Sequence, residues 1–230
     1  MKWASFLPAF MILFIIAVPS SAYPKLEYYV TDQVGVLTES DIYDIEDICI
    51  EAHKEKGVEM AVLIVNTTEP DDITMYAVKT FEESGIGQKG KDNGLLLLIS
   101  VSKKEWRIEV GYGLEGVLTD ILVNQIAQEH LVPFLEVGNY YEGILYTMAF
   151  LGREILDNYE GGPPRDDSPW HPIPFIPLNW WQLLISIIIL IAILSLTGGR
   201  LFFWIGGSFG RSGGGFGGGR SGGGGARGRF

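Results

Sequence analysis

The sequence lacks the residues that several large protein classes require. It has a single cysteine, Cys49, so no disulfide can form within the chain. Its three histidines, at positions 53, 130 and 171, are scattered and show no zinc-ligand spacing. No Gly-x-Ser-x-Gly, Walker or dinucleotide-binding glycine pattern is present. These absences argue against a disulfide-stapled fold, a zinc site, a serine hydrolase and a nucleotide-binding enzyme.

The C-terminal part of the chain has no acidic residue. All 28 acidic residues lie between Glu27 and Asp167. Residues 23–167 also contain 11 of the 17 basic residues, which gives this stretch a net charge of −17. The region after it carries five arginines and no acid. Such asymmetry indicates separate compartments or separate partners for the two parts. An acidic domain repels nucleic acid and tolerates divalent cations, so we expect no nucleic-acid partner for the folded domain.

The N-terminus is typical of an exported protein. Residues 1–22 carry a positive charge at Lys2, continue as an apolar run and end in small residues at Ala22. This pattern predicts a signal peptide cleaved before Tyr23. The alternative is an uncleaved N-terminal anchor, and in both cases the domain that follows is exported.

A second apolar run, residues 178–198, has no charge and is long enough for one transmembrane helix. Tryptophans lie near its start, and aromatic residues follow it beside Arg200. Because the basic side is the C-terminal side, the chain is predicted to be a single-pass cell-membrane protein. The N-terminal domain would be extracytoplasmic and the C-terminal tail cytoplasmic.

The remaining segments are separated by composition. Residues 161–177 are rich in proline and predict an extended spacer. Residues 199–230 consist mainly of glycine, serine and arginine, which cannot bury a core, so they are predicted to form a disordered cytoplasmic tail. Residues 23–160 are left as one extracytoplasmic domain.

Hydrophobic periodicity within this domain predicts alternating helices and strands. We expect helices over residues 38–57, 71–85, 119–133 and 139–158, and strands over residues 58–65, 95–101 and 106–110. The continuous apolar run at 95–101 indicates a central strand covered on both faces. The predicted fold class is α/β, a three-layer α/β/α sandwich with a small mixed sheet, followed by one transmembrane helix.

Two loops flank the predicted hairpin of the last two strands. Residues 91–94 come before it and residues 111–120 follow it, so an antiparallel hairpin brings the two loops together. A hard cation such as Ca²⁺ or Mg²⁺ would relieve repulsion between their carboxylates. The candidate metal ligands are Asp32, Asp92, Asn93, Glu115 and Asp120. The alternative is that Asp120 only caps its helix and residues 92–94 only form a turn.

These same loops resemble a known family. The runs KDNGLLLL (91–98), RIEVGYGLEG (107–116) and LTD (118–120) resemble the core of the TPM domain. The stretch VTDQVGVLT (30–38) resembles its N-terminal motif. The layout of signal peptide, domain, membrane helix and glycine-rich tail is similar to the YgcG-like, membrane-anchored bacterial and archaeal branch. One departure is the hairpin turn SKKE (102–105), where many members carry an Asp-Arg pair.

The resemblance implies an α/β/α sandwich and a varied functional record. Thylakoid members are linked to photosystem repair and reported as acid phosphatases, other members bind Ca²⁺, and an animal member modulates a receptor. The motifs carry over the same five residues as candidate site positions. Glu109 also matches, although it could simply pair with Arg107.

Two functions are compatible with these observations. The first is a divalent-cation-binding accessory module for the assembly, repair or quality control of membrane or envelope proteins. The second is a weak metal-assisted acid phosphatase. Apart from Lys89, Lys91 and Arg107, no basic residue lies near the acidic loops to hold a phosphate, and the net charge of −17 disfavours anionic substrates. The sequence therefore favours the binding module.

Overall fold

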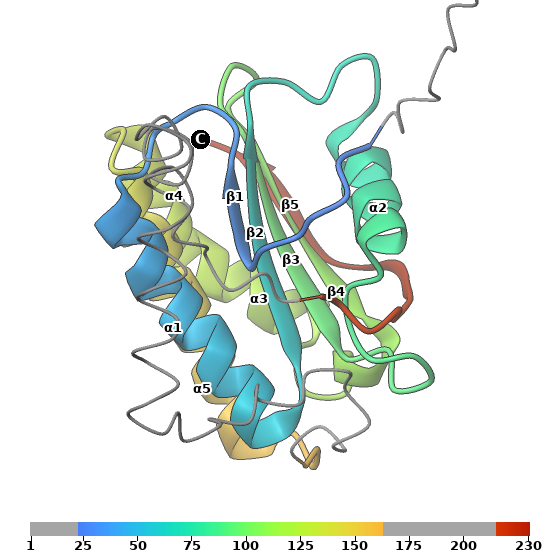
Figure 1. Cartoon of the computed structure of the whole chain (residues 1–230). Coiled ribbons are helices and arrows are strands. Elements are labelled where there is room, and N and C mark those ends of the chain that lie inside the picture. Colours follow the sequence, from blue (N-terminus) through green and yellow to red (C-terminus); the bar gives the residue numbers. More distant parts are fainter. Residues whose placement is uncertain (1–22, 163–214) are drawn as a thin grey trace, which may run out of the picture.

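The computed structural model describes residues 23–162 and 215–230, which form one mixed sheet with helices on both faces (Figure 1). The strand order is β1-β2-β3-β4-β5. The strands are β1 (Val30–Asp32), β2 (Glu59–Val65), β3 (Gly94–Ser100), β4 (Glu105–Gly111) and β5 (Ser221–Arg229). The first three are parallel, and β4 is antiparallel to both β3 and β5. The predicted α/β class with a mixed sheet is confirmed.

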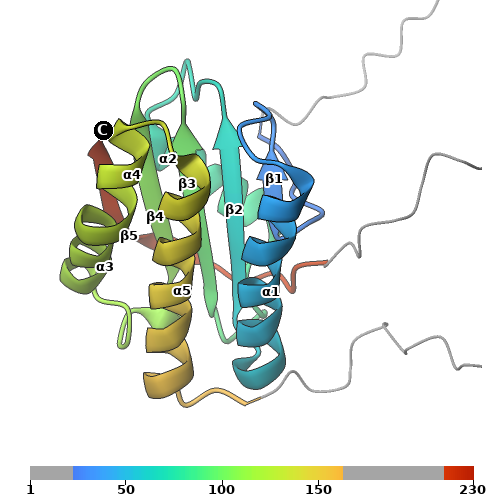
Figure 2. The ribbon, with the colours of Figure 1, turned by 90° about the vertical axis from the view of Figure 1, so that its left-hand side faces the viewer.

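The helices form two layers around this sheet. They are α1 (Glu39–Lys56), α2 (Ile73–Ser84), α3 (Asp120–Ile126), α4 (Val132–Glu136) and α5 (Tyr140–Asn158). Helix α2 covers one face, and the other helices cover the opposite face, where α1 and α5 lie side by side (Figures 1 and 2). The packing explains why the inner strands are almost entirely apolar: every residue of β2 and β3 is buried, and only Glu59 and Ser100, at their ends, are polar.

The boundaries of α1 and α2 follow from their capping residues. Thr38 and Asp41 form a reciprocal capping box at the start of α1, and Gly57 ends the helix in the left-handed conformation. Asp72 accepts the Thr74 N–H at the start of α2, and Gly85 ends that helix in the same way. These boundaries match the predicted ones.

The predicted helix over residues 119–133 is interrupted. Helix α3 begins after its cap, Thr119, and ends at Ile126. A wider helical turn over Ala127–Leu131 then leads into α4, where Pro133 lies in the first turn. Proline has no N–H to donate to the preceding turn, and its ring clashes with the carbonyl group four residues earlier, which explains why the regular α-helix is interrupted there.

The C-terminal tail departs most from expectation. Residues 215–230 were expected to be disordered, and instead Ser221–Arg229 form β5 along the edge of β4. The composition argument failed because an edge strand needs only main-chain N–H and C=O groups to pair, and glycine supplies both. In Figure 1 this strand lies at the edge of the sheet beside β4.

None of the helices within residues 23–162 and 215–230 is long and apolar enough to cross a membrane. The predicted signal peptide (1–22) and transmembrane helix (178–198) lie outside the described residues, as does the spacer beyond residue 162.

Candidate functional site

Five carboxylates lie along the path of the tail, from the start of β2 to the outer edge of β4. They form a group that we call the acidic rim: Glu59, Asp92, Glu109, Glu115 and Asp120. The two loops that hold three of them touch, as the hairpin predicted. The Gly113 N–H donates to the Asp92 carbonyl oxygen at 2.9 Å. A Cβ atom on Gly113 would lie closer than 3.0 Å to the Lys91 carbonyl oxygen, so glycine is needed for this approach.

The acidic rim contacts the tail at every one of its members. Three carboxylates accept main-chain N–H groups: Gly217 donates to Glu59 (2.9 Å), Arg220 to Asp92 (3.0 Å) and Gly225 to Asp120 (2.7 Å). The Ser221 hydroxyl donates to Glu109. Glu115 lies against Gly224, where an added Cβ would be 2.8 Å from its Oε1 atom. Carboxylates are strong acceptors for amide N–H groups, so the rim is suited to receiving an extended main chain.

A buried ion pair lies beneath the tail. Arg107 Nε and Nη2 donate to Glu109 Oε2 at 2.9 and 2.6 Å. Arg107 Nη2 also donates to the carbonyl oxygens of Gly223 (2.7 Å) and Gly224 (2.9 Å). Burial raises the pKa of Glu109, while the Ser221 hydroxyl and the Arg107 guanidinium act in the opposite direction. The two polar side chains of β4 are thus buried and bonded to the tail.

Glu59 is a member of the site that the sequence did not reveal. It opens the apolar strand β2, is only 3% exposed, and accepts the N–H groups of Gly87 (2.7 Å) and Gly217. Burial raises its pKa. A single glutamate at the start of an apolar run carries no sequence signal that would separate it from an exposed strand end.

The raised pKa of Glu59 predicts a pH dependence. Because the folded-state pKa lies above the unfolded value, the wild type loses stability relative to Glu59→Gln as pH rises from about 4.3 through the folded-state pKa. The change amounts to about 1.4 kcal/mol for each pH unit between the two pKa values. Urea unfolding of the full chain in mild detergent at several pH values, for both proteins, measures this difference. Parallel pH profiles would contradict the assignment.

Two of the predicted ligands have other roles. In the register of the sheet, Asp32 of β1 lies beside Ile64 of β2, and Ile64 lies beside Ile99 of β3. Ile99 is five residues from Gly94, where β3 begins. At about 3.3 Å per residue, Asp32 therefore lies about 16 Å along the strand direction from the start of β3, which is the end of the strand next to Asp92. Its carboxylate accepts three N–H groups of its own loop, from Val34, Gly35 and Leu37. Asp32 is therefore not part of the acidic rim.

Asn93 is next to the rim but is bonded within the fold. It is fully buried, its Oδ1 accepts the Gln88 N–H at 2.9 Å, and its Nδ2 donates to the Gly57 carbonyl oxygen at 2.9 Å. Asp120 does not cap α3, because the side chain of Thr119 does. Within residues 23–162 and 215–230, no group of three His, Cys, Asp or Glu side chains is placed to hold a metal ion. In this arrangement Asp92, Glu115 and Asp120 contact the tail.

The tail is also held by contacts outside the rim. Arg227 pairs with Asp72 at 3.0 Å and Arg229 with Glu105 at 2.8 Å. Ala226 is buried opposite Ile108, and the ring of Phe230 meets Tyr140 edge-on at 6.3 Å.

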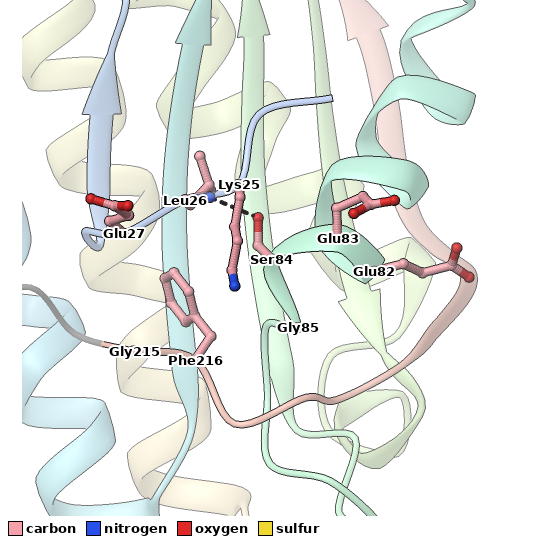
Figure 3. A pocket seen from close by; sticks show the side chains of 9 residues that line it. All are labelled: Lys25, Leu26, Glu27, Glu82, Glu83, Ser84, Gly85, Gly215 and Phe216. Atoms are coloured by element: carbon pink, nitrogen blue, oxygen red, sulfur yellow. Dashed lines mark hydrogen bonds between the residues drawn. The ribbon is translucent and has the colours of Figure 1, made fainter. Parts of the chain in front are cut away.

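At the other end of the tail, Phe216 packs edge-on against Tyr29 at 5.8 Å. Figure 3 shows Phe216 beside a surface hollow that is also lined by residues 25–27 and the end of α2. Lys25 extends toward the hollow, whereas Glu82 and Glu83 lie on its far side from Phe216. The tail is therefore anchored by an aromatic ring at each end, with a glycine-rich main chain between them.

This arrangement defines a mixed α/β domain with an acidic site at a sheet edge, where an extended segment is bound through its main chain. The model of the TPM domain family matches residues 30–153, and the chain belongs to this family. A comparison with curated proteins gave no match.

The chain is also similar to solved structures. The N-terminal domain of a P. gingivalis protein, determined by NMR, is 26% identical with a TM-score of 0.55, covering 60% of this chain and 88% of that one. The BA42 protein from Bizionia argentinensis is 23% identical with a TM-score of 0.48, covering 57% and 88%. The N-terminal domain of a Corynebacterium glutamicum protein is 17% identical with a TM-score of 0.46, covering 58% and 84%.

Proposed function

We propose that this chain is a membrane-tethered, extracytoplasmic TPM-domain protein that binds an extended segment of a partner at the edge of β4. The observation that supports this proposal is β5, a segment remote in sequence that pairs along β4 while the acidic rim accepts N–H groups of β5 and of the residues just before it. Addition of a strand to an exposed sheet edge is a common mode of peptide recognition. Its affinity comes from main-chain hydrogen bonds, and its specificity from side-chain pockets.

Tethering would focus this activity on membrane proteins. A signal peptide, a proline-rich spacer and an apolar segment at 178–198 would hold the domain near the membrane surface and raise its effective concentration there. The proposed partner is therefore a membrane or envelope protein, and the proposed role is accessory: assembly, repair or quality control.

Ca²⁺ or Mg²⁺ is proposed only as a competing ligand. Asp92, Glu115 and Asp120 offer the oxygen atoms that these cations prefer, but all three contact the tail in this arrangement. Cation binding would therefore require the tail to leave. No specific observation favours the acid phosphatase, because Arg107, the buried cationic side chain at the rim, is bonded to Glu109 and to two carbonyl oxygens.

The test is a calorimetric titration of a synthetic peptide of residues 215–230 into the isolated fragment 23–162. The isolated N-terminal domain of the P. gingivalis protein has been solved, which supports folding of such a fragment. We expect saturable binding that is lost when the peptide carries Gly225→Ala. Gly225 has a φ of +114°, and an added Cβ would lie closer than 3.0 Å to the Ile108 carbonyl oxygen.

The matched control is the Gly215→Ala peptide. An added Cβ there meets no atom within 4 Å, so its binding should equal that of the wild type. Absence of binding by a folded fragment, or equal binding of both variant peptides, would overturn the proposed edge site.

A further inference from the structure

Resting on the proposed function, we infer that residues 216–230 of this chain are the resident ligand of the β4 edge. They occupy the edge in cis and so lie in the same compartment as the domain. A partner must then displace the tail to bind. The observation that supports this inference is that the small residues and the charges of the tail match the edge of β4, in addition to the pairing of the two main chains.

The tail fits the edge by its pattern of small residues. An added Cβ on Gly228 would lie 2.8 Å from the ring of Trp106, and one on Gly222 would meet the Tyr112 ring. Ala226, the only residue between Gly222 and Arg227 with a side chain, is 7% exposed and joins the core on the α1 side of the sheet. A strand with larger side chains at these positions could not lie in this register.

The charges of the tail fit as well. Arg227 meets Asp72 at the start of α2, and Arg229 meets Glu105 of β4. The tail has no acidic residue, and its glycine N–H groups face the carboxylates of the rim. The ligand class is therefore a glycine-rich, basic strand with a small residue before its first paired arginine and an aromatic residue at its end.

Occupation in cis has a consequence for topology. Strand β4 lies in one compartment, so a tail paired with it must lie in that compartment too. A single membrane crossing between residues 162 and 215 would place the tail on the opposite side. The cytoplasmic tail predicted from the arginines and the cis pairing with β4 therefore exclude each other.

A cysteine pair in the full chain, in its native membrane, tests the inference. The Phe230 N–H donates to the Lys104 carbonyl oxygen, so the next pair, Glu105 and Arg229, is of the non-hydrogen-bonded kind. Such pairs have Cα atoms about 4.5 Å apart, within the range that a disulfide spans. Glu105→Cys with Arg229→Cys should therefore form an intramolecular disulfide under mild oxidation. Cys49 is fully buried and should not interfere.

The expected result is a disulfide within one chain, identified by mass spectrometry, whose yield falls at least tenfold with Gly225→Ala and is unchanged with Gly215→Ala. Disulfide-linked dimers alone would assign the tail to a second copy and overturn occupation in cis. Occupation in cis would also be overturned if no disulfide formed and the thiol at position 229 could be labelled only from the cytoplasmic side. In both cases the peptide could still bind fragment 23–162, so failure of this inference is distinct from failure of the proposed function.

Discussion

Replacing Gly113 by alanine is expected to destabilise fragment 23–162 by about 3 kcal/mol. The added Cβ would lie closer than 3.0 Å to the Lys91 carbonyl oxygen, so one of the two loops beside the acidic rim must shift. That shift would also strain the hydrogen bond from the Gly113 N–H to the Asp92 carbonyl oxygen. Urea unfolding followed by tryptophan fluorescence measures the change, because Trp106 lies fully buried on the adjoining strand.

Gly116 provides the matched control in the same loop. An added Cβ there meets no atom within 4 Å, and its φ is not in the left-handed region, so Gly116→Ala should change stability by less than about 1 kcal/mol. If the two variants were equally stable, the close contact between the loops would not exist in solution. If only Gly113→Ala were destabilised, its affinity for the 215–230 peptide should fall as well, since Asp92 would be displaced.

The sequence was sufficient where a local signal decided the structure. The capping residues of α1 and α2 fixed their ends, and the continuous apolar run fixed β3 as a central strand. The meeting of loops 91–94 and 111–120 followed from hairpin geometry alone. In each case the determining residues are neighbours in the chain or belong to one hairpin.

The failures share a different cause. Asp32 was misplaced because its position depends on the parallel register of β1 with β2, which places Asp32 and Asp92 at opposite ends of the sheet. Strand β5 was missed because glycine has no side chain to produce a period of two, although its main chain can pair like any other. Glu59 was missed because its partners, Gly87 and Gly217, come from distant segments. Each of these features depends on contacts between distant parts of the chain.

The buried pair of Arg107 and Glu109 leads to the other large expected effect. Arg107→Met should weaken binding of the 215–230 peptide to fragment 23–162 by about 2–5 kcal/mol, which is about 30-fold to several thousand-fold. The variant would leave the carbonyl oxygens of Gly223 and Gly224 without their donor, and Glu109 buried without its cation. Lys103→Met is the control, because the Lys103 side chain pairs with Glu69 on the exposed surface.

The pH dependence of this loss separates its two causes. Without Arg107, the pKa of Glu109 should rise further, because burial would act without the opposing cation. Protonation then removes the buried charge, so the loss of affinity should be smaller at pH 5 than at pH 7.5. For the same reason, Arg107→Met with Glu109→Gln should bind the peptide more tightly at pH 7.5 than Arg107→Met alone. Equal affinities for the single and double variants at both pH values would show that the loss comes only from the two unpaired carbonyl groups, and that the buried charge contributes nothing to recognition of the tail.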